Sequence, residues 1–142
     1  MVTVRKFKAL RPKKGLEKKV ASPPYDVLSS EEAREMARGN PYSFLHVIKP
    51  EIDLPAGTDL YAPEVYQKAR ENIEKFIREG ILIQEEKPRL YIYRQVMQGR
   101  EQYGIVGCVS AEEYEKDLIK KHELTRKAKE EHRVKHIEAT NA

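Results

Sequence analysis

Residues Pro63–Glu79 read PEVYQKARENIEKFIRE and indicate the fold more clearly than any other stretch. Apolar residues recur here every three or four positions, which is the spacing of one face of an α-helix. They are Tyr66, Ala69, Ile73, Phe76 and Ile77. Gly80 follows as the expected C-terminal cap. We therefore predict a helix over residues 63–79 with its apolar face in a hydrophobic core.

A β-hairpin is predicted downstream of this helix. Leu90–Met97 alternates tyrosine with apolar residues, Gln98–Gly99 has turn composition, and Gln102–Val109 returns. We expect the 63–79 helix to pack against a sheet that contains this hairpin. Cys108 stands in an apolar run and is expected in the core.

The upstream elements are shorter. Val2–Leu10 and Glu17–Ala21 are predicted as strands on either side of a Pro- and Gly-containing turn. Ser29 has capping-box spacing to the glutamate three residues later, which predicts a helix to about Arg38. Tyr42–Ile48 reads YSFLHVI and is predicted as a buried strand with His46 as a core histidine.

The order of these elements predicts an α+β fold, a small mixed sheet with a β-hairpin and packed helices, in a single domain over residues 1–142. Apolar residues make up 39% of the chain and charged residues 35%, which is typical of a globular protein. No apolar run is long enough to span a membrane, and no secretory signal is present. One cysteine excludes an internal disulfide framework. We expect a cytoplasmic protein without a membrane partner.

Basic residues gather at the two ends of the chain. Residues 1–19 carry eight Lys or Arg and one Glu, and residues 118–142 carry seven Lys or Arg and four Glu. If the fold brings these ends together, the resulting patch attracts nucleotides, nucleic acid or another polyanion. Scattered solubilising charge is the alternative.

The segment Leu118–Asn141, LIKKHELTRKAKEEHRVKHIEATN, has few apolar residues for a helix held only by its core. If it is helical, one arc of about 100° collects basic and hydroxyl side chains. These are His122, Thr125, Arg126, Lys129, Arg133 and His136. A helix face of this composition is suited to binding a phosphate or carboxylate group. The alternative interpretation is a basic helix that is simply exposed to solvent.

Several catalytic and phosphate-binding motifs are absent from the sequence. The chain has no phosphate-binding glycine loop, no H-E-x-x-H and no G-x-S-x-G. His132 and His136 are four residues apart, but no third metal ligand is evident, so we expect no resident metal centre. The proline-fixed loop Ser22–Asp26 leads into a helix, where functional side chains are common. Asp26 there and Glu123 among the cations are the candidate acid–base groups.

Four blocks together resemble one family. They are SPPYDVLS at 22–29, NPYSFLHVIKPEIDLP at 40–55, PRLYIYRQ at 88–95 and KKHELTRKAKEEHR at 120–133. The family is the domain-of-unknown-function family numbered 1015. Its members are longer, so the resemblance implies an N-terminal fragment that lacks its own C-terminal region. The family pattern usually has an acidic residue where His132 stands, so the resemblance does not support a catalytic role for His132.

A more distant similarity concerns the H-E-x-T and K-x-x-x-R residues from His122 to Arg133. They resemble the phosphate-binding motif of ParB-like and sulfiredoxin-like domains, a superfamily with nucleotide hydrolases and kinases of free serine. This similarity implies a phosphotransferase that uses ATP or ADP with magnesium and acts on a small hydroxylated metabolite. Thr125, Arg126, Lys129 and Arg133 then bind phosphate, Glu123, Asp26 and His122 are catalytic, and Ser22 and Tyr25 form the substrate loop.

Two alternatives remain open from the sequence. One is a module that binds nucleic acid or another polyanion through the basic ends, with Tyr91 and Tyr93 stacking on bases. The other is a structural or regulatory domain that is inert without its C-terminal region. Phosphotransfer requires the loop 22–26 and the segment 122–133 to lie together around a cleft.

Overall fold

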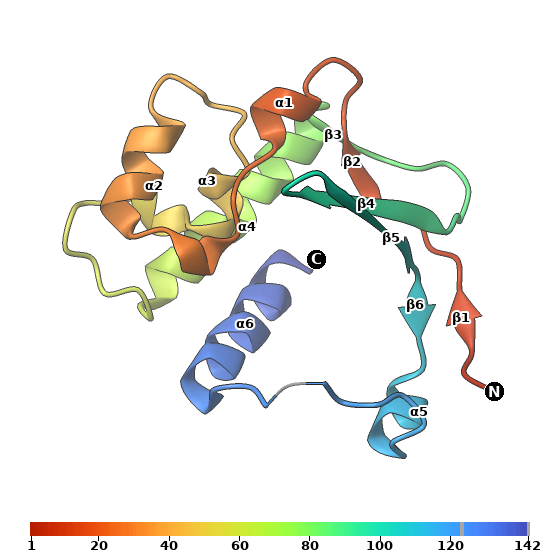
Figure 1. Cartoon of the computed structure of the whole chain (residues 1–142). Coiled ribbons are helices and arrows are strands. Elements are labelled where there is room, and N and C mark those ends of the chain that lie inside the picture. Colours follow the sequence, from red (N-terminus) through yellow and green to blue (C-terminus); the bar gives the residue numbers. More distant parts are fainter. Residues whose placement is uncertain (123, 142) are drawn as a thin grey trace. The chain divides into compact units, whose positions relative to one another are not determined.

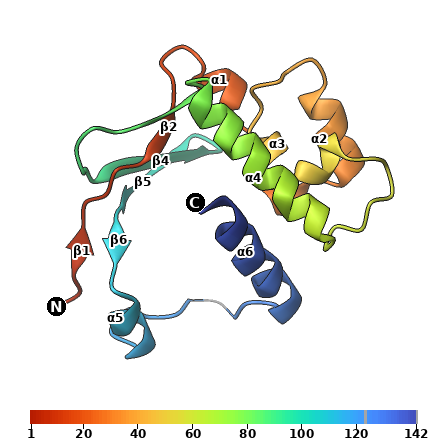
Figure 2. The same cartoon turned by 180° about the vertical axis from the view of Figure 1, so that it is seen from behind.

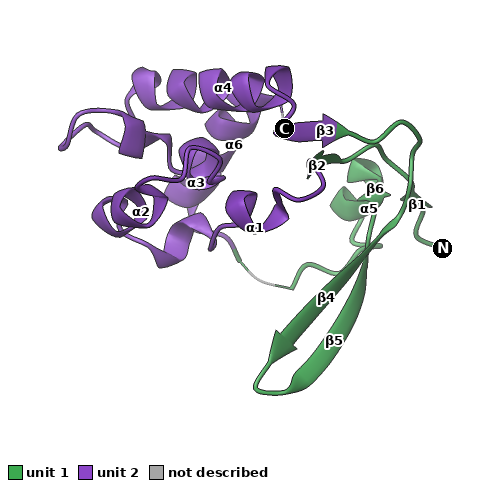
Figure 3. Cartoon of the chain, turned by 90° about the horizontal axis from the view of Figure 1, so that it is seen from above, with its two compact units in different colours: residues 1–11, 84–124 green, residues 12–83, 125–142 purple. Residues whose placement is uncertain are grey.

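The computed structural model describes residues 1–122 and 124–141. Contacts divide the chain into two compact units (Figure 3). Unit 1 contains Met1–Arg11 and Gln84–Leu124, and unit 2 contains Pro12–Ile83 and Thr125–Ala142. Helices together with small antiparallel sheets make the chain α+β, as predicted. In the described part of the chain, no helix is both long and apolar enough to cross a membrane.

Unit 2 is built around α4 (Pro63–Arg78), which confirms the predicted helix. Proline at the first helical position suits the start, and Gly80 has a left-handed φ of 69° just after the end. The buried residues are Val65, Tyr66, Ala69, Ile73 and Phe76. Ile77 was predicted on the same buried face but is 45% exposed. The buried face includes Val65, and Ile77 lies at the edge of that face.

Other helices cover the apolar face of α4 (Figures 1 and 2). They are α3 (Leu45–Ile48), the 3-10 helix η2 (Pro50–Asp53) and α6 (Lys127–Thr140). A further helix, α2 (Ser30–Ala37), packs against α3 and η2. Its predicted capping box is confirmed, since Ser29 and Glu32 each accept a hydrogen bond from the other's backbone N–H.

The predicted strand over Tyr42–Ile48 is wrong. Its backbone bonds locally, with Val47 N–H donating to the Phe44 carbonyl and Lys49 N–H donating to the Leu45 carbonyl. Leu45 and Val47 are almost fully buried. A short apolar run fits a buried helix as well as a buried strand, and the neighbouring elements here are helices.

The predicted strand over Glu17–Ala21 is also wrong, because this stretch forms the short helix α1 (Glu17–Val20). The Glu17 carboxylate accepts a hydrogen bond from Gly15 N–H at 2.8 Å and closes the preceding turn. Val20 enters the core with Phe76 and Ile81. The strands β2 (Leu10–Pro12) and β3 (Leu82–Gln84) pair with each other.

Unit 1 contains the predicted hairpin, formed by β4 (Tyr91–Met97) and β5 (Arg100–Val106). Gln98 and Gly99 both have positive φ, as a two-residue turn that matches strand twist requires. The short strands β1 (Val4–Arg5) and β6 (Cys108–Val109) pair antiparallel, and α5 (Ala111–Glu115) follows them.

The hairpin lies in unit 1, whereas α4, against which we expected it to pack, lies in unit 2. All residues of the hairpin except Tyr91 are exposed, including Ile92 and Ile105 at 79% and 76%. Within unit 2, α3, η2 and α6 cover the face of α4. Cys108 is exposed, so its predicted core position is wrong as well.

Candidate functional site

The proline-fixed loop and the basic helix α6 contact each other in unit 2. Pro24 leads into the 3-10 turn η1 (Tyr25–Val27). The guanidinium of Arg133, on α6, lies 4.5 Å from the centre of the Tyr25 ring, within the range of a cation–π interaction. The loop therefore lies beside the helical part of the predicted segment, which begins at Lys127.

A cavity of about 180 Å³ opens beside this contact. Its wall includes residues of four chain segments: the η1 turn, the α3–η2 region, the loop before α4, and α6. They are Tyr25, Asp26, Ile48, Lys49, Glu51, Leu60, Tyr61, Lys129 and His132. We refer to it as the α6 pocket. Of the predicted site residues, Tyr25, Asp26 and Lys129 line it.

The N-terminal half of the predicted basic helix is not helical. α6 begins at Lys127, and Arg126 has an extended conformation as its N-cap residue. Thr125 donates a hydrogen bond to the Glu130 carboxylate at 2.6 Å. Because Thr125 and Arg126 precede the helix, the predicted arc of six side chains does not form as one face. Helix formation here depends on packing, and α6 packs against α4.

The other predicted residues lie elsewhere. His122 is exposed in unit 1, whereas the α6 pocket lies in unit 2. Glu123, the predicted base, lies outside the described residues. Ser22 is half-buried in the proline loop but does not line the pocket. Only some of the predicted site residues therefore line the pocket.

Arg133 carries a donor without an acceptor. Its Nη1 atom is buried, and among the described residues it has no hydrogen-bond partner. A buried N–H of a charged group without an acceptor is costly, and most such groups in folded proteins are satisfied. Stacked on Tyr25, the planar guanidinium holds this donor in a fixed direction. Arg133 is not itself among the residues that line the α6 pocket, but it contacts Tyr25, which does.

His132 lies between two tyrosines. Its Nδ1 shares a hydrogen bond of 2.8 Å with the Tyr66 hydroxyl, and the Tyr61 ring meets it edge-on at 5.5 Å. Burial lowers the pKa of His132, and the positive charges of His136, Arg133 and Lys49 lower it further, against the opposing effect of Glu51. Protonation of the His132 imidazole is therefore disfavoured relative to a free histidine.

His136 has a structural position rather than a site position. Its Nε2–H donates to the Val47 carbonyl at 2.8 Å, and the residue is 5% exposed. Burial lowers its pKa, with a smaller effect from Arg133, although the bond to Val47 opposes this. Sequence reasoning placed His136 on the basic face, but it attaches α6 to α3.

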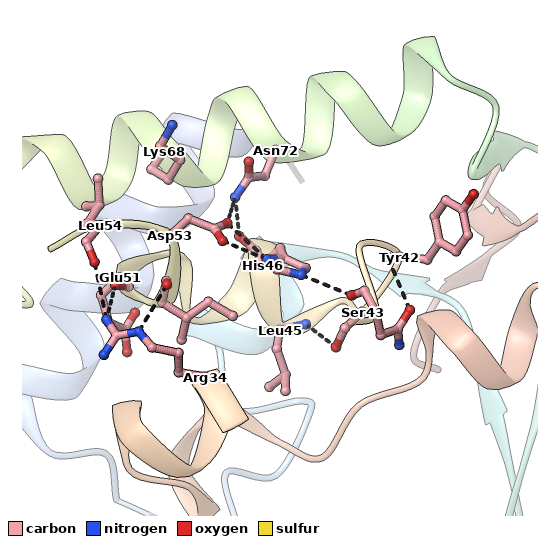
Figure 4. Close-up of polar contacts among 12 residues, drawn as sticks. Arg34, Tyr42, Ser43, Leu45, His46, Glu51, Asp53, Leu54, Lys68 and Asn72 are labelled. Carbon is pink, nitrogen blue, oxygen red and sulfur yellow. Dashed lines mark hydrogen bonds and ion pairs between the residues drawn. The ribbon is translucent and has the colours of Figure 1, made fainter. Parts of the chain in front are cut away.

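Charged residues that the sequence did not single out support the pocket wall. Lys49 and Glu51 form an ion pair of 3.0 Å with side chains only 10% and 9% exposed, and Ser30 donates to the same Glu51 oxygen. Arg34 donates to three backbone oxygens of the η2 region (Figure 4). Lys49 and Glu51 lie in a proline-containing stretch that reads as an exposed loop, so no sequence signal indicated their burial.

A second polar cluster in unit 2 is centred on His46 (Figure 4). His46 Nδ1–H donates to the Asp53 carboxylate at 2.9 Å, and Nε2–H donates to the Asn40 carbonyl at 3.1 Å. Hydrogen bonding to Asp53 raises the pKa of His46, although burial opposes it. Burial raises the pKa of Asp53, but the bonds from His46 and Asn72 outweigh it and lower the pKa. Both shifts favour the charged forms of His46 and Asp53, and His46 is a satisfied histidine as predicted.

The pocket offers little to a metal by itself. Within the described residues, no group of three His, Cys, Asp or Glu side chains has the arrangement of a metal site. Asp26 is exposed at the pocket wall, whereas Glu51 is engaged by Lys49 and Ser30. One carboxylate together with substrate phosphates and water is nevertheless a donor set that Mg²⁺ accepts.

Tyr91 and Tyr93, the residues proposed to stack on bases, differ in their exposure to solvent. Tyr91 packs on Phe7 with ring centres 5.1 Å apart, and its hydroxyl donates to the Phe7 carbonyl and accepts from Ala9 N–H. Tyr93 is 55% exposed. A flat two-tyrosine platform is therefore not present in the hairpin.

Comparison with known proteins identifies the family. The family model described as "Protein of unknown function (DUF1015)" matches residues 4–142. The chain belongs to this family. No curated protein and no solved structure matches it. The DUF1015 match covers both units, including the η1 turn and α6, so the whole α6 pocket lies within the family domain.

Proposed function

We propose that this DUF1015 chain binds the phosphate group of a small metabolite or nucleotide at the α6 pocket. The observation that carries this proposal is a pair of cations at the pocket. Lys129 lines it, and Arg133, whose buried Nη1 has no acceptor in the described chain, contacts Tyr25 of its wall. Phosphate oxygens are the acceptors that a guanidinium fork matches best. Lys129, one turn earlier on α6, adds a mobile positive charge at the pocket wall.

The local field supports an anion. Among the residues that line the pocket, Lys49 and Glu51 neutralise each other, and Lys129 and Asp26 carry one exposed charge of each sign. Arg133, beside the wall, then leaves one net positive charge near the cavity. The lowered pKa of His132, caused by burial and then by nearby positive charges, is in keeping with this excess. An anion between these groups offsets their mutual repulsion.

The reaction that we propose is phosphoryl transfer to a hydroxylated metabolite such as free serine, with ATP or ADP and magnesium. Such chemistry depends mainly on positioning and charge stabilisation. Lys129 and Arg133 would hold phosphate oxygens. Asp26 would accept the proton of the attacking hydroxyl or bind magnesium. Thr125 and Arg126 immediately precede α6 and are the next candidates for phosphate contacts.

Isothermal titration of the protein with inorganic phosphate and with ADP–magnesium tests this proposal. Replacing Arg133 by Gln should weaken phosphate binding at least about tenfold, because hydrogen bonds to charged groups are the stronger class. Lys129→Gln should weaken it less. Lys135→Gln is the matched control, because Lys135 is an exposed lysine on the same helix that does not line the pocket.

Two results would reject the proposal. One is an absence of phosphate and nucleotide binding in the wild-type protein. The other is equal weakening by Lys135→Gln and Arg133→Gln, together with a steep fall of affinity with salt, since that pattern describes non-specific polyanion binding. Arg133→Lys refines the positive result, because it keeps the charge and removes the planar fork.

A further inference from the structure

The surroundings of His132 leave one of its ring nitrogens for a ligand. Nδ1 is occupied by the hydroxyl of Tyr66, a residue that is 8% exposed on α4. Burial raises the pKa of Tyr66, followed by smaller effects of Tyr61 and Asp59, so the phenol keeps its proton. The ring of His132 is thus held by a fixed neutral partner. Since His132 also lines the α6 pocket, Nε2 is the atom that remains for a bound molecule.

This nitrogen fits a hydroxyl group in either tautomer. If Nδ1–H donates to the Tyr66 oxygen, Nε2 is an acceptor, and if the Tyr66 hydroxyl donates to Nδ1, Nε2–H is a donor. A hydroxyl both donates and accepts, so it pairs with Nε2 in both cases. A methyl or methylene group at the same place leaves Nε2 without a partner, which costs binding energy.

The size of the cavity restricts the ligand. Its volume of about 180 Å³ lies below the roughly 300 Å³ at which pockets for drug-sized ligands usually begin. A phosphate group with a short carbon chain fits this space, and a larger ligand extends beyond it into solvent.

We propose that the α6 pocket selects a small hydroxylated phosphate compound rather than a nucleotide, and that His132 is the residue that recognises its hydroxyl through Nε2. This inference rests on the proposed phosphate binding and names the ligand class of that same site. Lys129 at the pocket wall and Arg133 beside it bind the phosphate end, His132 recognises the hydroxyl end, and Tyr66 positions His132.

A matched set of probes tests the inference by isothermal titration. Glycerol 1-phosphate carries hydroxyls on a three-carbon chain, and n-propyl phosphate has the same chain without them. Wild-type protein should bind the glycerol compound about three- to tenfold more tightly, the value of one hydrogen bond. His132→Phe should lose this preference but still bind inorganic phosphate. Adenosine monophosphate should bind more weakly than glycerol 1-phosphate.

Two further variants separate recognition from a merely structural role. His132→Gln offers an amide in place of the ring nitrogen and should restore part of the preference. Tyr66→Phe keeps the packed ring but removes the partner of Nδ1, so the preference should fall although His132 is present. In the NMR spectrum, the ring resonances of His132 should shift more with glycerol 1-phosphate than with n-propyl phosphate.

The outcomes distinguish this inference from the proposed function. If wild-type protein binds none of the phosphates, the proposed function fails and the inference with it. If phosphates bind but the two three-carbon probes bind equally, or if His132→Phe keeps the preference, only the inference is overturned. Tighter binding of adenosine monophosphate than of glycerol 1-phosphate also overturns it. Circular dichroism confirms that each variant is folded, and His132→Gln with the NMR shifts decides the matter if His132→Phe is not.

Discussion

Two regions of the chain use similar apolar residues with opposite results. In unit 2, Phe76 on α4 is 2% exposed, whereas Ile105 in the hairpin of unit 1 is 76% exposed. Each region has the regular pattern of its secondary structure, period 3.6 in the helix and period 2 in the hairpin. The difference is that α4 has α3, η2 and α6 as a covering layer. A pattern thus predicts the element, and its neighbours determine burial.

The polar side chains differ in the same way. In unit 2 the charged residues Lys49 and Glu51 are buried, paired and bonded to Ser30. In the hairpin, Arg94 and Glu101 form an ion pair whose side chains are 53% and 43% exposed. Ion pairs on the surface contribute little to stability, whereas a buried ion pair is held in one geometry by its neighbours. Unit 2 therefore has the preorganised side chains that a binding site needs.

The largest expected effect is that of Phe76→Ala. It should lower the free energy of unfolding by about 3–5 kcal/mol, because it leaves a cavity in the core with Val20 and Ile81. Urea denaturation followed by far-UV circular dichroism measures it, since α2, α4 and α6 all lie in unit 2. Wild-type stability in this variant would show that the α4 face is not a core.

Asp53→Asn should lower the free energy of unfolding by about 1–2 kcal/mol at pH 5.5, because it removes the charged partner of His46. The pKa of His46 is raised from 6.5, so this stabilisation is complete below that pH and is lost as the pH rises through the folded pKa. The pKa of Asp53 is lowered from 3.8, so at the acid end the loss begins only below that pH.

Comparing the wild-type protein and Asp53→Asn at pH 5.5 and pH 8.5 therefore tests the pair. The stability difference should be larger at pH 5.5. Glu64→Gln, an exposed carboxylate on α4, serves as the control with little difference at either pH. A gap that is the same at both pH values would contradict a charged His46–Asp53 pair.

Removing a helix cap should also affect the two units differently, with a smaller change in stability. Ser29→Ala should cost about 1 kcal/mol, because it breaks the capping box of α2, a helix packed in unit 2. Ser110→Ala removes the equivalent cap of α5, a five-residue helix in unit 1 without buried residues. Thermal denaturation should show a clear loss for the first variant and a minor one for the second. Equal losses would remove the distinction between the units.

The smallest expected effect is that of Ile105→Ala. It should cost about 0.5 kcal/mol, because Ile105 loses only its cross-strand contact with Ile92. Ile73→Ala, an isoleucine that is 3% exposed on α4, is the matched comparison and should cost several times more. A loss for Ile105→Ala as large as that for Ile73→Ala would mean that the hairpin is covered in solution.

The sequence predicted the fold where local signals suffice. Helix 63–79 follows from its period and its glycine cap, the α2 start from Ser29 and Glu32, and the hairpin from its turn. The strand predicted over Tyr42–Ile48 was wrong because a seven-residue, mainly apolar run has no period that separates a buried helix from a strand. The predicted start of α6 was wrong because a polar segment carries no local signal that fixes where its helix begins.

The site was predictable only in part, for a similar reason. The proline-fixed loop and the basic segment were expected together, and the contact between Tyr25 and Arg133 brings them together. Lys49, Tyr61 and Tyr66 were not expected near them. These residues reach the pocket or its histidine through the packing of α3, η2 and α4, which no local pattern encodes.

One NMR measurement tests most directly the claim that the binding site lies in unit 2. Inorganic phosphate is added to ¹⁵N-labelled protein, and the shifts of backbone amides are followed. We expect changes at residues 25–26, 48–49, 51, 60–61 and 129–133, and unchanged signals in the hairpin at 91–106. Changes confined to the hairpin and to residues 1–11, or spread evenly over all basic segments, would contradict a site at the α6 pocket.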